Sequence, residues 1–170
     1  MKYVSSDANV WIDFYEARSL SLPFRLPDTC FIMYEESISE LKTPETLHDD
    51  LLSLGLQLVE MTDEELLFAA TYSDMRLSGP DKVALSIAKL RGIPLLTGDR
   101  RLRQCAQRER IEVFGTLGLL DRLFEAEAIN AQEYAGCLLL LQAANGRRVR
   151  LPEQELAERI KRICVMTGSG

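Results

Sequence analysis

The 170-residue sequence is poor in the side chains on which many metal and nucleophilic sites depend. His48 is the only histidine, and no two of the four cysteines are spaced as a C-x-x-C ligand pair. Zinc sites built on two or more histidines, or on a paired-cysteine motif, are therefore excluded. We expect the thiols to be reduced and mostly buried, as in proteins outside oxidising compartments.

Long apolar runs and glycine-rich nucleotide motifs are also missing. The apolar stretch CLLLLQAA at residues 137–144 is far too short to span a bilayer, and the N-terminal residues turn polar after Val4, unlike an export signal. No P-loop, dinucleotide-binding turn or nucleophile elbow occurs. These absences favour a cytoplasmic protein without membrane association, and they argue against simple nucleotide binding.

Positive charge is in deficit, because 20 Lys and Arg residues stand against 26 Asp and Glu residues, for a net charge of −6. Such a surface should on average repel polyanions, so nucleic-acid binding requires a local basic patch. Residues 89–110 provide one, with seven basic residues against two acids, whereas residues 35–65 carry ten acids and one lysine.

Short apolar runs alternate with helical patterns over residues 1–126. The run IPLLT at residues 93–97 is typical of a strand covered on both faces. Strands are also predicted at residues 3–6, 30–33, 56–61 and 112–114, with helices between most of them. This alternation predicts an α/β fold with a central parallel sheet covered by helices. We expect one domain over residues 1–126 and an all-helical C-terminal extension over residues 127–170.

Four acids fall near the carboxyl ends of the predicted strands, where ligands bind in such sheets. Asp7 follows the first strand and Asp99 follows the IPLLT strand, while Asp81 opens the helix before that strand. Glu40 lies on the short helix predicted over residues 36–41. Taken singly, each acid is better explained as a helix cap, a turn residue or a solvated side chain. Their joint placement favours a hard divalent cation, which would compensate the repulsion among the carboxylates.

Four blocks of the sequence resemble PIN domains, the nuclease domains of VapC-type toxins and of several RNA-processing proteins. The blocks are VSSDANVWID at 4–13, ISEL at 38–41, PDKVALSIAKLRGIPLLTGDRRLRQCA at 80–106 and FGTLGLLDRL at 114–123. The third block is the most specific, since an acid that opens a helix lies eighteen residues before an acid in a TGD turn. The resemblance implies a three-layer PIN-like domain and metal-dependent cleavage of RNA.

The resemblance also implies roles for individual residues. Glu36 lies one turn before Glu40 and is the alternative for the second acid. Asn9 and Thr97 match polar positions that support the acid cluster, whereas residues 42–75 carry no family signature. The implied cofactor is Mg²⁺ or Mn²⁺. The catalytic, metal-binding acids of the family correspond to Asp7, Glu40, Asp81 and Asp99.

The expected reaction is hydrolysis by a metal-activated water, which needs no histidine as base. Arg100, Arg101 and Arg103 directly follow Asp99 and can hold the scissile phosphate by paired hydrogen bonds. The helices after residue 126 are apolar enough to pack on their own domain or on a second copy, so we expect a homodimer. A toxin would have, besides its RNA substrate, an antitoxin protein as partner.

Two other function classes stay open. A non-catalytic PIN-like module that binds protein or nucleic acid would share the fold, although the presence of all four acids counts against it. A phosphatase of the haloacid-dehalogenase type would carry a second acid two residues after its first-strand Asp, where Asn9 stands here. It would also carry an Asp soon after the late Gly-Asp motif, where Arg103 stands, so this alternative is the weaker one.

Overall fold

The computed structural model describes residues 1–168, which form two compact units. The first unit contains Met1–Val10 and Asp28–Gly115, and the second contains Trp11–Pro27 and the chain from Thr116 onward. The chain leaves the first unit within helix α1 (Ala8–Glu16) and returns to it just before the second strand. The boundary at residue 126 that we expect from the sequence stays a prediction.

A sheet of five parallel strands forms the centre of the first unit, with the order β3-β2-β1-β4-β5. Ser5 is paired with Ile32 on one side and with Leu95 on the other. This sheet confirms the predicted α/β fold class. Its strands are β1 (Lys2–Ser6), β2 (Thr29–Tyr34), β3 (Gln57–Val59), β4 (Leu95–Leu96) and β5 (Val113–Phe114).

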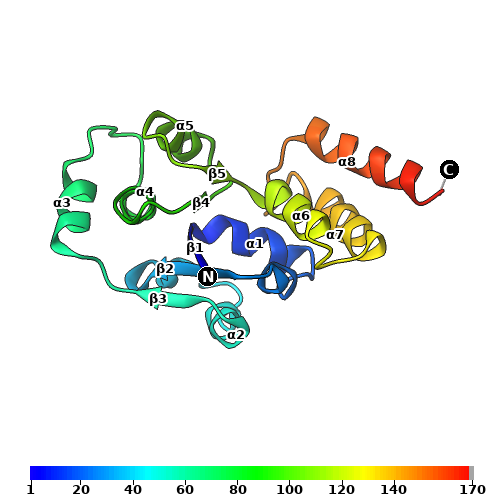
Figure 1. Ribbon diagram of the computed structural model, residues 1–170, viewed down its shortest axis with the longest axis horizontal. Helices are drawn as coiled ribbons and strands as arrows, with labels where there is room; N and C mark the ends of the chain where they lie inside the picture. The colour runs from blue at the N-terminus through cyan, green and yellow to red at the C-terminus, as the bar shows by residue number, and fades with distance from the viewer. Residues whose placement is uncertain (169–170) are drawn as a thin grey trace. The chain divides into compact units, whose positions relative to one another are not determined.

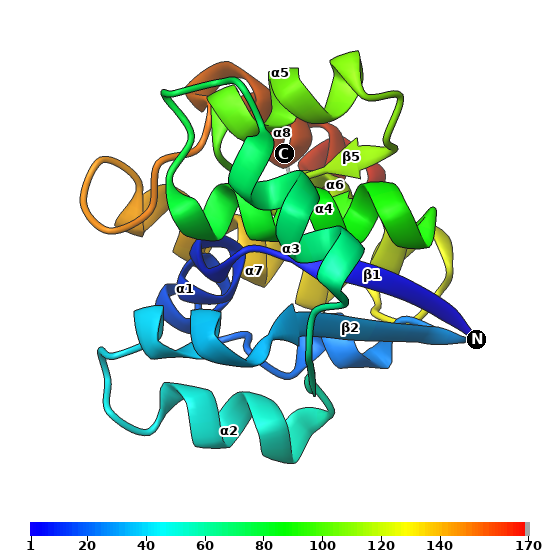
Figure 2. The ribbon, with the colours of Figure 1, turned by 90° about the vertical axis from the view of Figure 1, so that its left-hand side faces the viewer.

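Helices cover both faces of this sheet (Figure 1). From β1 through β2 to β3 the chain moves toward one edge of the sheet, and from β4 to β5 it moves toward the other edge. Crossover connections between parallel strands are right-handed, so connections that run in opposite directions place their helices on opposite faces. Helix α2 lies on one side, and α3, α4 and α5 lie together on the other, with α3 and α4 in front of β1 in Figure 2. These helices are α2 (Leu47–Leu54), α3 (Asp63–Thr71), α4 (Gly79–Arg91) and α5 (Arg100–Arg108).

The helices α3 and α4 both begin at capping boxes, in which a side chain and a backbone amide bond reciprocally. Thr62 accepts from the backbone N–H of Glu65, and Ser78 accepts from that of Asp81. Helix α4 ends at Gly92, whose φ of +63° is left-handed and therefore favours glycine. Local sequence thus determines where α4 starts and ends, and with it the place of Asp81.

The core of the first unit contains the side chains between β4, α4 and α5, among them Leu85, Leu95 and Leu102. The polar end of β1 is buried as well. The hydroxyl group of Ser5 donates to the carbonyl of Ala84 at 3.0 Å, and that of Ser6 donates to the carbonyl of Ile32 at 3.0 Å. These bonds compensate the burial of both hydroxyls and attach β1 to α4 and β2.

Two segments differ from the expectation drawn from the sequence. The sequence predicts a short helix over residues 36–41, and the segment is a 3₁₀ helix, η2 (Glu35–Glu40), which begins and ends one residue earlier. None of its residues is buried, so it lacks the packed apolar face that would stabilise a longer α-helix. Helix α2 was not predicted, because it buries only Leu47 and Leu51, which make a short and weak periodic signal.

The second unit is helical. The ring of Trp11 stacks on that of Phe24, with centroids 5.3 Å apart, and Asp121 accepts hydrogen bonds from Tyr134 at 2.6 Å and Arg159 at 2.8 Å. The C-terminal helices are confirmed. No helix within residues 1–168 is long and apolar enough to cross a membrane. Besides most of α1, the elements are η1 (Leu22–Arg25), α6 (Thr116–Glu125), α7 (Ala131–Ala144) and α8 (Glu153–Met166).

Candidate active site

The order of the strands reverses between β1 and β4, and in open parallel sheets ligands bind beyond the carboxyl ends at such a point. Asp7 follows β1 there, and its backbone N–H donates to the carbonyl of Leu96 at 2.9 Å. A cavity of about 10 Å³, with room for about one water molecule, is lined at this place by Asp7, Tyr34 and Glu40 among others. The structure therefore brings two of the predicted acids to one small cavity.

Thr97 connects two of the predicted acids. Its hydroxyl group donates to Oδ2 of Asp7 at 2.9 Å and accepts from the backbone N–H of Asp99 at 3.1 Å. Thr97 is completely buried, so water does not compete for these bonds. The PIN resemblance implies a supporting role for Thr97 and for Asn9, but Asn9 lies exposed on the first turn of α1.

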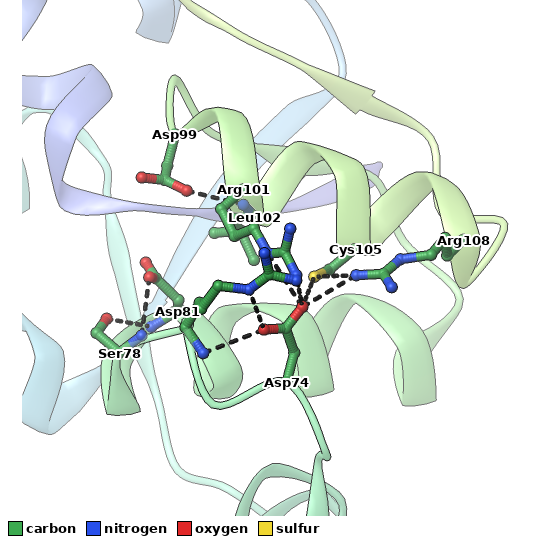
Figure 3. Close-up of polar contacts among 9 residues, drawn as sticks. Asp74, Ser78, Asp81, Asp99, Arg101, Leu102, Cys105 and Arg108 are labelled. Atoms are coloured by element: carbon green, nitrogen blue, oxygen red, sulfur yellow. Dashed lines mark hydrogen bonds and ion pairs between the residues drawn. The ribbon is translucent and has the colours of Figure 1, made fainter.

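Asp81 and Asp99 are both held at the N-terminal ends of helices (Figure 3). Asp99 is the N-cap of α5, and its Oδ1 accepts from the amide of Leu102 at 2.7 Å. Oδ2 of Asp81 accepts from the amide of Ser78 at 3.1 Å. An ionised carboxyl group has about four lone-pair sites, so a cap leaves capacity for a cation. The capping role and a ligand role are therefore compatible.

The carboxyl groups are coupled electrostatically. Burial raises the pKa of Asp7 to about 7, and the charges of Asp81 and Glu40 act in the same direction, while the bond from Thr97 opposes them. Burial also raises the pKa of Glu40, to which Asp81 adds, and that of Asp81, to which Asp99 adds. Each of the four acids therefore interacts with at least one other, and Asp81 is at the centre of the group.

Glu40, and not Glu36, lines the cavity with Asp7. Glu36 lies beside Tyr34, where its charge adds to burial in raising the pKa of that phenol. The 3₁₀ geometry of η2 explains the separation, since at three residues per turn two residues four apart point about 120° away from each other. An α-helix would have placed both on one face. Glu40 therefore lies at the cavity beside Asp7, and its role as the second acid stays a prediction.

The donor set suits a hard cation in kind, because all four side chains offer carboxylate oxygens. Among the residues that the structure describes, no three His, Cys, Asp or Glu side chains form a group that could hold a metal ion. Mg²⁺, however, is usually held by one or two carboxylates and keeps several waters. A pair of carboxylates from this group of four acids would therefore be sufficient to bind one Mg²⁺ ion.

The three arginines after Asp99 have different surroundings. Arg100 is exposed, whereas Nε of Arg101 donates to Asp74 at 3.0 Å. A Cβ atom at Gly115 would lie 3.1 Å from the carbonyl oxygen of Thr97 and 3.3 Å from Nη1 of Arg103, so glycine permits a close approach there. Arg103 is thereby placed against the end of β5. Contacts of these arginines with RNA stay predictions.

Ser78 and Asp74 take part in the site in ways that the sequence analysis does not predict. Residues 78–81 indicate a helix entry, and the spacing of Ser78 and Asp81 matches a capping box, a signal that could have predicted their bond. Asp74 lies between α3 and α4 and has no such local signal, because its partners Arg101 and Arg108 are 27 and 34 residues away in the chain.

Comparison with models of protein families gives a match over residues 3–164 to the family DUF3368, which is described as a PIN domain. No curated protein and no solved structure matches the chain. The match spans both units and contains all four acids, and PIN domains are in general nuclease-type modules. The coverage of nearly the whole chain, on a parallel sheet with acids at its switch point, means that this protein belongs to the PIN-domain family.

Proposed function

We propose that the protein is a ribonuclease that hydrolyses RNA phosphodiester bonds with one or two Mg²⁺ or Mn²⁺ ions, each bound by a pair of acids among Asp7, Glu40, Asp81 and Asp99. The observation that carries the proposal is the coupling of these four acids beyond the carboxyl ends of β1 and β4. Carboxylates held close together repel one another, which is unfavourable in the protein alone, and a bound cation would relieve this repulsion. Membership of the PIN-domain family supports the same activity.

The side chains of the protein bind the cation and orient the reaction. Thr97 holds the carboxyl group of Asp7 through Oδ2, and the helix caps hold Asp81 and Asp99. Because the pKa of Asp7 is about 7, a proton competes with the cation at this carboxyl group near neutral pH. When bound, the cation supplies a water of lowered pKa and stabilises the leaving oxygen.

The basic residues after Asp99 support RNA binding. Arg100 is exposed at the start of α5, and Arg103 lies at the end of β5, so these two are the proposed phosphate contacts. We also propose a homodimer, and an antitoxin partner if the chain is a toxin. The exposed leucines Leu139 and Leu140 on α7 support a protein contact, as they are 52% and 39% exposed.

Replacing Glu40 with glutamine should lower the rate of Mn²⁺-dependent cleavage of single-stranded RNA by at least about tenfold, as expected when a group that binds or supports a metal is lost. Glu36→Gln is the matched control, since it makes the same change on the same 3₁₀ helix and should cleave at nearly the parental rate. Rates would be measured on labelled RNA with Mn²⁺, Mg²⁺ or EDTA.

A larger loss in Glu36→Gln than in Glu40→Gln would exchange the two assignments. Absence of cleavage by the parent, together with no rise of its melting temperature in Mn²⁺, would favour the non-catalytic binding module instead.

Replacing Ser78 with alanine should cost about 1 kcal/mol of stability, because the N-cap of α4 is lost. It should also weaken the stabilisation by Mn²⁺, since Asp81 then loses part of its restraint. Thr62→Ala removes the equivalent capping box of α3 and should cost the same without affecting the response to Mn²⁺. Urea unfolding with and without Mn²⁺ measures both effects, and an equal Mn²⁺ response in the two variants would contradict a ligand role of Asp81.

A further inference from the structure

Asp74, in the segment between α3 and α4, collects basic side chains from α5 (Figure 3). Nε of Arg101 donates to Oδ2 of Asp74 at 3.0 Å, and Nη2 of Arg108 donates to the same oxygen at 3.1 Å. The backbone N–H of Arg76 donates to Oδ1 at 3.1 Å. The side chain of Asp74 is only 10% exposed, so these contacts replace most of its hydration.

Asp74 stays ionised at neutral pH in these surroundings. Hydrogen bonds from Arg101 are the main cause that holds the pKa of its carboxyl group below the usual range, and Arg108 contributes in the same direction. Both Nε and Nη2 of Arg101 donate to the one carboxyl group. Charge-assisted bonds of this kind restrict the geometry of the two partners as well as attracting them.

The pair between Asp74 and Arg101 lies next to both helix starts that carry candidate ligands. Arg101 is the second residue of α5, and the residue after it, Leu102, donates its amide to Asp99. On the other side, Asp74 is four residues before Ser78, the N-cap of α4 to which Asp81 bonds. Figure 3 draws the capped carboxyl groups of Asp81 and Asp99 together with this pair.

We infer that Asp74 is a positioning residue, whose ion pair with Arg101 ties the start of α4 to the first turn of α5 and so sets the separation of Asp81 and Asp99. The inference rests on the proposed function. The charge of Asp99 acts on Asp81, so the two carboxylates repel each other when no cation is bound. Without the tie, the two helix starts would relax apart, and a cation that needs both carboxylates would bind more weakly.

In this role Arg101 differs from Arg100 and Arg103, which are the proposed phosphate contacts. Its guanidinium group compensates Asp74, so its effect on cleavage would run through the acids and not through a phosphate. A loss of the pair should therefore change the affinity for the cation and kcat, whereas a lost phosphate contact would mainly raise KM for RNA.

A second ion pair of the first unit provides a matched control. Nε and Nη2 of Arg91 donate to the two oxygens of Glu65 at 2.6 and 3.0 Å, and Glu65 is 2% exposed. This pair likewise joins an acid, here within α3, to an arginine of a neighbouring helix. It lies, however, at the C-terminal end of α4, opposite the end that carries Asp81.

The test compares the parent with Asp74→Asn, Asp74→Glu and Glu65→Gln by thermal melting in a Mn²⁺ titration and by kcat and KM on single-stranded RNA. Asp74→Asn and Glu65→Gln should both lower the melting temperature without metal. Only Asp74→Asn should raise the Mn²⁺ concentration for half-maximal stabilisation, by about tenfold, with a similar fall in kcat at fixed Mn²⁺. Asp74→Glu keeps a carboxylate for Arg101 and should recover much of the loss.

Equal Mn²⁺ midpoints in Asp74→Asn and Glu65→Gln would overturn the inference while leaving the proposed function in place. A parent chain with neither cleavage nor a Mn²⁺-dependent shift would overturn the proposed function, and the positioning role with it. If Asp74→Asn folds poorly, Arg101→Gln removes the same pair from α5 and must show the same shift of the Mn²⁺ midpoint. A raised KM with an unchanged midpoint in that variant would instead make Arg101 a phosphate contact and contradict the inference.

Discussion

Replacing Asp99 with asparagine should reduce Mn²⁺-dependent cleavage of RNA at least about a hundredfold while the fold is retained. Asparagine is as good an N-cap as aspartate, so α5 should keep its bond to the amide of Leu102. The variant loses an anionic oxygen from the proposed metal site. Metal-ion support of the transition state is worth several kcal/mol, and a loss of about 3 kcal/mol corresponds to roughly 150-fold in rate.

The control for Asp99→Asn is Asp50→Asn, which makes the same change of net charge at an exposed position of α2. Single-turnover rates in Mn²⁺ and unfolding in EDTA would be measured for both. Because the charge of Asp99 acts on Asp81, metal-free Asp99→Asn should be at least as stable as the parent. Cleavage by Asp99→Asn at the parental rate would show that Asp99 is a helix cap without a ligand role.

The metal-free protein should become less stable as pH rises from about 4 to 8, because the pKa of Asp7 is about 7 in the folded chain against an ordinary value of 3.8. The folded state then binds the proton more tightly than the unfolded state does. The resulting stabilisation is complete below the unfolded pKa and is lost as pH rises through the folded pKa. The difference between the folded and unfolded pKa of Asp7 corresponds to roughly 4 kcal/mol of unfolding free energy. Asp13, with a pKa raised to about 6 by burial, adds a change of the same sign.

Asp7→Asn should remove most of this pH dependence, since the amide stays neutral at every pH. The variant should be more stable than the parent at pH 8 in EDTA, and the two should differ little at pH 4. Asp13→Asn is the control, because it leaves the contribution of Asp7 in place. Urea unfolding across pH gives the comparison, and parallel curves for the parent and Asp7→Asn would contradict the raised pKa.

Divalent cations should offset the loss of stability at high pH in the proteins that keep Asp7. At pH 8 the ionised carboxyl group is available as a ligand, so Mn²⁺ should restore stability to the parent and to Asp13→Asn. Asp7→Asn should gain less from Mn²⁺ at the same pH. An equal gain in all three proteins would place the cation away from Asp7.

The parts of the site that follow strands could be predicted from the sequence. The run IPLLT identifies a buried strand, although the regular strand β4 is only Leu95–Leu96, and Thr97 and Asp99 follow it by simple order. The rule that ligands bind at the carboxyl ends of parallel strands then brings Asp7 to the same place. The bonds of Thr97 to both acids agree with that placement.

Other parts depend on contacts that leave no local pattern. The 3₁₀ conformation that separates Glu36 from Glu40 follows from the lack of a buried face, which spacing alone does not reveal. The pair of Asp74 and Arg101 joins residues 27 apart. Nothing in the segment around Asp74 marks it, and the sequence predicts a phosphate contact for Arg101 and not an ion pair. Hydrophobic periodicity predicts which face of a segment is buried. An ion pair between distant residues depends instead on which segments pack together in the folded chain, and local sequence does not reveal this.

The caps that hold Asp81 and Asp99 have an electrostatic consequence. The N-terminal end of a helix carries about half a positive charge from its aligned peptide dipoles. Two such ends, those of α4 and α5, point their amide groups at two of the clustered carboxylates. The backbone therefore supplies a fixed counter-charge whether or not a ligand is bound. Part of the repulsion among the acids is therefore already compensated in the folded protein, so the site is preorganised for the cation that we propose.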